Sequence, residues 1–262
     1  MNGAAIRGIL IATGALCALL SVLAIFDQAW EMVYGWLGIA LVAETALLSG
    51  RPSSPGTSSG EVSPAIALEH RAISAISFLT SVFVPVVAIL HAGFLDGIPG
   101  VILAGLVILS AVYRLAFHDW ATPVTHFEGL PAAWGIAGFG LHAFDATPLA
   151  AALAIGTLLI LTLVPVSWPH PLQSSVLKAA TRCVTAAWAV AAASTLWRGF
   201  PATGPAKLVL LTGAVYGLAL MAQSLRVNGF ASLPSVRKPP VLAAFDTSSL
   251  DTDETTGDPN RK

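Results

Sequence analysis

Charged side chains are scarce in this sequence. They make up 10% of its 262 residues, whereas hydrophobic residues make up 55% and the mean hydropathy is +0.77. Soluble domains carry about 25% charged residues, so most of this chain is not built to face water. The formal net charge of −1 gives no basic surface for nucleic acid, and we expect no nucleic-acid partner.

Cysteines and signature motifs are scarce as well. The two cysteines, Cys17 and Cys183, lie within apolar runs, where we expect buried small residues rather than a disulfide or a metal site. The sequence has no Walker loop, no G-x-G-x-x-G between a strand and a helix, no G-x-S-x-G and no heptad repeat. It therefore carries no signature of a P-loop protein, a dinucleotide-binding domain or an α/β-hydrolase.

Long apolar runs are what the sequence does contain. A run of about 18 or more residues can cross a hydrocarbon core roughly 30 Å thick, where only helices and closed barrels satisfy the backbone. Continuous rather than alternating hydrophobicity favours helices. We therefore predict an all-α, polytopic integral membrane protein of about eight transmembrane helices, over residues 9–26, 32–48, 65–94, 98–117, 130–144, 149–168, 176–197 and 208–225.

A proline and two polar segments interrupt this pattern. Pro85 lies inside the third span and predicts a kink. The segment 49–64 is rich in Ser, Pro, Gly and Thr and predicts a loop without regular structure. From Arg226 onward the chain is polar and its end is acidic. We therefore divide it into a helical domain, 1–225, and a cytoplasmic, disordered tail, 226–262.

Basic residues are unevenly distributed between the two sides of the predicted bundle. If the N-terminus is inside, the outer side holds only Arg198 and Lys207 of the thirteen lysines and arginines, and the cytoplasmic side holds the other eleven. The turns near Asp27, Asp96 and Asp145 contain no basic residue. Cytoplasmic loops carry the excess of Lys and Arg in membrane proteins, so we predict that both termini are cytoplasmic.

Ionisable residues gather at the ends of the second to fifth spans that this topology places in the cytoplasm. A charge at membrane depth costs about 2.5–3.5 kcal/mol on insertion scales, which makes such residues functional candidates. We predict that they line a shared cytoplasmic pocket: Glu44, Arg51, Glu69, His70, Arg114, His118, Asp119, His126 and Glu128. The alternative is that they mark helix ends, where charged side chains reach water. The histidines lack a metal-binding spacing, so we predict no zinc site.

Several short segments follow one another in an order that is similar to that of a known family. They are Trp36–Val42, Phe83–Pro85, His91–Gly93, Leu109–Arg114, Phe127–Pro131 with Trp134, Val164–Pro165 and Pro169–Pro171. Over roughly residues 8–225 the sequence thereby resembles bacterial phosphatidylcholine synthases, which are members of the CDP-alcohol phosphatidyltransferase family. The resemblance implies eight helices with both ends cytoplasmic in the bacterial inner membrane, CDP-diacylglycerol and choline as substrates, and a homodimer.

The metal motif of that family is degenerate in this chain. Its pattern is D-x-x-D-G-x-x-A-R followed by G-x-x-x-D-x-x-x-D, in which four carboxylates hold divalent metal and the last Asp deprotonates the alcohol. The resemblance places Glu44 at the first Asp and Leu47 at the second. It places Ile73 and Ser77 at the last two. Three of the four carboxylates are missing, so we predict no metal and no cofactor.

Three interpretations of function remain open at this point. The first is a phosphatidylcholine-synthase-like membrane protein that is catalytically inactive and binds a membrane lipid or nucleotide, or assists a partner enzyme. The second is an active transferase that uses Mg²⁺ or Mn²⁺ in a centre rebuilt from Glu44, Glu69, His70, Asp119 and Glu128. The third is an unrelated transporter of lipids or small molecules, although the sequence shows no inverted repeat.

Overall fold

The computed structural model of the protein describes residues 3–49, 64–117, 126–128, 133–163, 167–169 and 178–228. The chain divides into two units, Met1–Gly229 and Phe230–Lys262, and every described residue belongs to the first. Almost all of the predicted loop and tail therefore lies outside the described residues. The last helix continues to Asn228, three residues beyond the end of the predicted helical domain.

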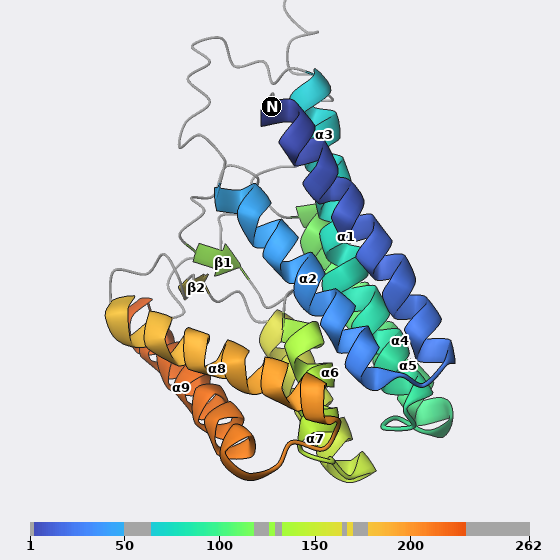
Figure 1. Cartoon of the computed structure of the whole chain (residues 1–262), viewed down its shortest axis with the longest axis vertical. Coiled ribbons are helices and arrows are strands. Elements are labelled where there is room, and N and C mark those ends of the chain that lie inside the picture. The colour runs from blue at the N-terminus through green and yellow to red at the C-terminus, as the bar shows by residue number, and fades with distance from the viewer. Residues whose placement is uncertain are drawn as a thin grey trace, which may run out of the picture. The chain divides into compact units, whose positions relative to one another are not determined.

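Helices make up nearly all of the described structure (Figure 1). They are α1 (Gly3–Phe26), α2 (Trp30–Ser49), α3 (Pro64–Phe78), the π-helix η1 (Leu79–Phe83), α4 (Val84–His91), α5 (Gly97–Phe117), α6 (Ala133–Ala143), α7 (Pro148–Leu163), α8 (Lys178–Arg198) and α9 (Gly204–Asn228). Because α3, η1 and α4 follow one another without a break, the described residues form eight helical rods at the predicted positions. The predicted helical fold is confirmed.

The number of membrane spans is a separate question from the number of helices. By length and composition, two helical stretches in the described residues can cross a membrane, Ala5–Phe26 and Arg71–His91. Three further apolar stretches within the described helices are shorter, Gly97–Tyr113 of α5, Pro148–Leu163 of α7 and Gly204–Leu220 of α9. The eight-span arrangement thus stays a prediction.

The sixth helix is shorter than the sequence predicts. It was expected to reach Trp168, but α7 ends at Leu163. The residues Ser167–Pro169 form strand β2, which pairs antiparallel with β1 (His126–Glu128). Proline supplies no backbone N–H and disfavours helical geometry in the residue before it, so Pro165 and Pro169 do not support a continued helix.

Pro85 disturbs its helix in a specific way. It has no N–H to donate, so one hydrogen bond of the regular i to i−4 pattern is lost. Just before it, residues Leu79–Phe83 form the π-helical segment η1, in which Thr80 and Val82 are buried. Such single-turn π-bulges are rare and occur often at functional sites. At the place where the sequence predicts a kink, the structure has a wider, π-helical turn that joins α3 to α4.

Four described turns lie together at one end of the helices, which we call the turn end (Figure 1). They are residues 27–29, 92–96, 144–147 and 199–203. The backbone N–H of Ala202 donates to the carbonyl of Ala143, at the end of α6, at 2.9 Å, and the rings of Phe26 and His91, at the ends of α1 and α4, lie 6.1 Å apart. Glu44 lies near the other end of α2, which we call the Glu44 end.

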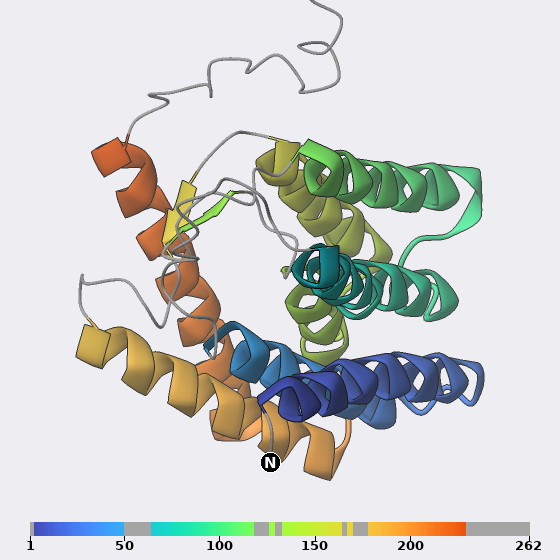
Figure 2. The ribbon, with the colours of Figure 1, turned by 90° about the horizontal axis from the view of Figure 1, so that it is seen from above.

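Two buried apolar clusters hold the helices together. One joins α1, α2, α4, α6, α8 and α9 around residues such as Val33 and Phe139. The other joins η1, α4, α5, α6 and α7 around Val107 and Trp134. Since α4 and α6 contribute to both clusters, they lie between the α8–α9 pair and the α5–α7 side, as Figure 2 shows. Large apolar side chains remain on the outside, including Ile98, which is 77% exposed.

Candidate functional site

The positions that the resemblance assigns to the metal motif lie around one small cavity. It has a volume of about 20 Å³ and is formed by α1, α2, α3 and η1. Its lining comprises Leu10, Ile11, Gly14, Ala40, Ala43, Glu44, Leu47, Ile73, Ile76, Ser77 and Thr80. Glu44 and Leu47 come from α2, and Ile73 and Ser77 come from α3. The helix register inferred from the sequence therefore brings all four motif positions to one place.

A short hydrogen bond crosses this cavity between two helices. The hydroxyl of Ser77 on α3 donates to Oε1 of Glu44 on α2, with 2.5 Å between the oxygens, in partly buried surroundings. Distances of about 2.5–2.7 Å are typical of a hydroxyl bound to a carboxylate. One oxygen of the single carboxylate at the four motif positions is thus occupied by a serine from the neighbouring helix.

The remaining walls do not suit a divalent ion. Leu47 and Ile73 offer no oxygen, and the hydroxyl of Thr80 donates to the backbone carbonyl of Ile76 at 2.9 Å. A cavity needs roughly 10–15 Å³ to hold one water molecule, so this cavity has room for about one. Mg²⁺ needs six oxygen ligands, and one water with these walls does not supply them. Among the described residues, no three His, Cys, Asp or Glu side chains are grouped so that they could hold a metal. These walls do not fit the family's metal ions.

Close packing of α1 closes the cavity on a third side. A Cβ added to Gly14 would lie 2.8 Å from Cγ2 of Ile76, a distance that real Cβ contacts do not show. The side of the cavity formed by α2 also carries small side chains, Ala40 and Ala43. Small residues allow helix backbones to approach closely in membranes. The helices around Glu44 are therefore packed tightly, which keeps the cavity near the volume of one water molecule.

The other predicted pocket residues are only partly placed. The backbone is described for five of them: Glu69 and His70 in α3, Arg114 in α5, and His126 and Glu128 in β1. In the two-stranded ribbon, His126 lies opposite Pro169 and Glu128 opposite Ser167. Arg51, His118 and Asp119 lie outside the described residues. A pocket shared by these residues and Glu44 stays a prediction.

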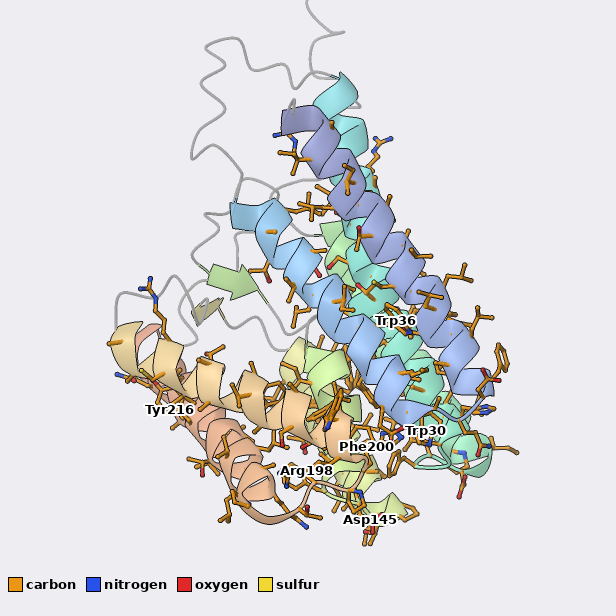
Figure 3. All side chains as sticks on the ribbon, viewed as in Figure 1. Trp30, Trp36, Asp145, Arg198, Phe200 and Tyr216 are labelled. Atoms are coloured by element: carbon orange, nitrogen blue, oxygen red, sulfur yellow. The ribbon has the colours of Figure 1, made fainter. Side chains whose placement is uncertain are left out.

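A second polar centre, at the turn end, was not anticipated from the sequence. His142 on α6 is 7% exposed, and its Nδ1 lies 3.0 Å from the carbonyl oxygen of Gly138 and 3.0 Å from the hydroxyl of Tyr34. Aromatic rings surround it, with centroid distances of 4.7 Å to Trp30, 4.8 Å to Phe94 and 5.5 Å to Phe200. Trp30 and Phe200 come from α2 and the α8–α9 turn (Figure 3).

The hydrogen-bond partners of His142 set its tautomer. A carbonyl oxygen can only accept, so the short contact to Gly138 places the hydrogen on Nδ1. Nε2 is buried and has no hydrogen-bond partner in the described residues. The arrangement joins α2, α6 and the turn 199–203. Trp30 and Tyr34 at i, i+4 lie on one face of a helix, as do Phe139 and His142 at i, i+3, and this spacing could have revealed the centre.

The two cysteines differ in their surroundings. Both are free thiols. Cys17 is buried, as predicted, whereas Cys183 is exposed on α8. The prediction of burial is therefore wrong for Cys183, because an apolar run shows that a segment is hydrophobic but does not show which of its faces packs on neighbouring helices.

Comparisons with known proteins give one consistent result. No family model matches the chain. It is similar to curated proteins named phosphatidylcholine synthase from Bradyrhizobium diazoefficiens, 30% identical over 191 residues that cover 71% of this chain and 68% of the relative, and Agrobacterium fabrum, 24% identical over 208 residues that cover 79% and 85%. A third, from Rhizobium meliloti, is 25% identical over 182 residues, with coverage of 70% and 74%.

Proposed function

This chain belongs to the phosphatidylcholine synthase family, and we propose that it is an inner-membrane protein that retains the family's fold and binds a membrane lipid but no longer transfers a phosphatidyl group. The observation that carries the proposal is the cavity between α2 and α3. The four motif positions meet there, and they supply one carboxylate, Glu44, which is hydrogen-bonded to Ser77.

The chemistry of the transfer explains why these residues matter. The alcohol must lose its proton as its oxygen attacks the phosphorus of CDP-diacylglycerol, and CMP must leave. A base and bound cations are needed for these two events. The resemblance assigns Ser77 to the position of the last Asp, and a serine hydroxyl is not a base at neutral pH. Leu47 and Ile73 bring no charge to hold cations near the pyrophosphate.

The membrane part of the proposal is supported by the surface and by the turns. Exposed apolar side chains also occur outside the two long apolar stretches, including Leu149 on α7 and Leu208 on α9. Large exposed apolar surfaces are typical of membrane contact. We place the turn end outside and both termini in the cytoplasm, because the turn end holds two of the thirteen lysines and arginines, Arg198 and Lys207, and the other eleven fall on the side of the termini.

The decisive experiment is a transferase assay on the purified full-length protein in lipid nanodiscs. It is incubated with CDP-diacylglycerol, choline, and Mg²⁺ or Mn²⁺, and release of CMP is measured beside the Bradyrhizobium diazoefficiens relative. We expect no CMP above the protein-free background. Release that is abolished in Glu44→Gln would overturn the proposed loss of activity and support a centre rebuilt around that residue.

A restoration experiment tests the assignment of the motif positions. The quadruple variant Glu44→Asp, Leu47→Asp, Ile73→Asp and Ser77→Asp returns all four carboxylates to the cavity. We expect it to gain Mn²⁺ binding in calorimetry, since carboxylate oxygens are the ligands that hard cations prefer. The matched control places three aspartates at exposed α2 and α3 positions. Equal Mn²⁺ binding by both variants would contradict the assignment.

A further inference from the structure

The imidazole of His142 has one buried nitrogen without a hydrogen bond. Its Nδ1 donates to the carbonyl of Gly138, with 3.0 Å between the two atoms, so Nε2 keeps a free lone pair. Nε2 is buried and has no hydrogen-bond partner in the described part of the chain. Buried polar atoms without a partner are costly and rare in native structures. The lone pair of an imidazole binds a proton, and histidine does so near physiological pH.

The aromatic surroundings of His142 suit a positive charge. The ring centroids of Trp30, Phe94, Tyr34 and Phe200 lie 4.7, 4.8, 5.2 and 5.5 Å from that of the imidazole. Aromatic rings attract a cation whose distance from the ring centroid is within about 6 Å. The four rings come from α2 and from the turns 92–96 and 199–203, and Figure 3 shows Trp30 and Phe200 at this place. A proton on His142 is thus held where three segments meet.

Glu31 of α2 links His142 to the turn between α8 and α9. Its Oε1 accepts the backbone N–H of Phe200 at 3.3 Å, and a Cβ on Gly199 would lie 3.5 Å from the same oxygen. The carboxylate also acts electrostatically on His142. Its bond to Phe200 is longer than most N–H···O bonds, and hydrogen bonds between two charged groups are shorter and stronger than this. A charged His142 is therefore a stronger partner for Glu31 than the amide of Phe200.

The other ionisable groups around His142 are less suited to this role. The hydroxyl of Tyr34 lies 3.0 Å from Nδ1, the nitrogen that already carries a hydrogen. The other charged or titratable residues at the turn end are exposed, so water and salt screen their charges. They are Asp27 between α1 and α2, His91 on α4, Asp96 between α4 and α5, Asp145 after α6, Arg198 on α8 and Lys207 on α9.

We propose that His142 binds a proton at Nε2 when the pH falls below neutral, and that the charged ring draws Glu31 away from the N–H of Phe200 and loosens the turn between α8 and α9. The N–H of Ala202 keeps its bond to the carbonyl of Ala143 at 2.9 Å. The proposed topology places the turn end outside, so this junction responds to the pH of the outer solution. The inference rests on the contacts at the turn end and not on the proposed loss of catalysis.

Hydrogen–deuterium exchange of the full-length protein in nanodiscs tests this exchange of partners. Protection of the Phe200 amide is measured at single-residue resolution and corrected for the intrinsic rate at each pH. It should be lower at about pH 5 than at about pH 7.5, by roughly 2- to 10-fold, the contribution of one hydrogen bond. Protection of the Ala202 amide in the same turn should not change. Constant protection of Phe200, or an equal loss at Ala202, would overturn the proposal.

Substitutions assign the proton to His142. His142→Phe keeps an aromatic ring but binds no proton, so it should remove the pH dependence at Phe200. The matched control, His91→Phe, replaces an exposed histidine whose ring lies 6.3 Å from that of Trp30, and it should retain the pH dependence. Persistence of the effect in His142→Phe, or its loss in His91→Phe, would overturn the assignment.

A substitution at Glu31 tests the second half of the exchange without changing the aromatic packing. Glu31→Gln keeps an oxygen that can accept the N–H of Phe200 and removes the negative charge that attracts a charged His142. The protection of Phe200 should then be the same at both pH values, and pH dependence that persists would overturn the role of Glu31. Because no CMP is measured, failure here is distinguishable from failure of the proposed function.

Discussion

Ser77 of α3 donates its hydroxyl hydrogen to Glu44 of α2 across 2.5 Å. The resemblance places acidic residues at both positions in the family, and two carboxylates that face each other repel unless a cation lies between them. A hydroxyl and a carboxylate attract each other directly. We interpret the pair as a direct link between two helices at the place where the family's pattern calls for a metal-bridged one.

The Ser77–Glu44 link should be measurable as a coupling energy. Ser77→Ala leaves the partly buried carboxylate without its partner and should lower the free energy of unfolding by about 1–3 kcal/mol. In a double-mutant cycle with Glu44→Leu, the two effects should not add, because the second substitution removes the group left unpaired. Thermal unfolding in detergent provides the measurement. Additive effects would show that the two side chains do not stabilise each other.

The cavity should not bind Mg²⁺ or Mn²⁺. It offers one carboxylate, and the hydroxyls of Ser77 and Thr80 are already bonded, so a hard cation lacks its six oxygen ligands. Calorimetry with each metal, with and without CDP-diacylglycerol, should show no saturable binding in the micromolar range. Binding that disappears in Glu44→Gln would contradict this expectation and support the rebuilt active site.

Two glycines on α6 should respond differently to a methyl group. A Cβ at Gly138 would lie 2.8 Å from the hydroxyl oxygen of Tyr34, whereas a Cβ at Gly140 would meet nothing within 4 Å. Gly138→Ala should therefore cost about 1–3 kcal/mol of stability through overpacking. Gly140→Ala should be neutral or stabilise by about 0.5–1 kcal/mol, because alanine restricts the unfolded chain. The measurement is the melting temperature of each variant. Equal shifts in melting temperature would contradict close packing of Gly138 against Tyr34.

The proposed topology predicts opposite accessibility for two exposed positions. In a cysteine-free background, Asp96→Cys at the turn end should react with a membrane-impermeant maleimide in intact spheroplasts. Arg71→Cys at the Glu44 end should react only after the membrane is permeabilised. Gel-shift labelling of both variants is the measurement. The reverse result would mean that the termini lie outside.

The polar tail should be dispensable for folding. Residues after Pro240 are rich in Ser, Thr and Asp and lack apolar periodicity, so they cannot bury enough apolar surface to order themselves. A chain that ends at Pro240 should insert into the membrane at the same level and melt at the same temperature as the full chain. A large loss of folded protein would show that the tail packs on the helices.

Some features of the fold could be predicted because they depend on local sequence. The helices at 9–26 and 98–117 were found from apolar runs alone, because the continuous hydrophobicity of a segment is independent of its partners. Pro85 predicted a kink for the same reason, and the structure has the π-helical segment η1 just before it. The ribbon of His126–Glu128 with Ser167–Pro169 could not be predicted. Its two strands are three residues long and about forty residues apart, and neither is long enough to show the alternation of apolar and polar residues that marks a strand.

The sequence by itself determined the helical class and the positions of the helices, and the assignment of Glu44, Leu47, Ile73 and Ser77 to the motif positions stays a prediction. Only the tertiary structure decided that Ser77 bonds to Glu44 and that Tyr34, Phe200 and His142 meet at the turn end. The physical reason is helix rotation. Neighbouring residues on a helix point about 100° apart, so the face that meets a partner is set by the packing of all helices together and not by any one of them.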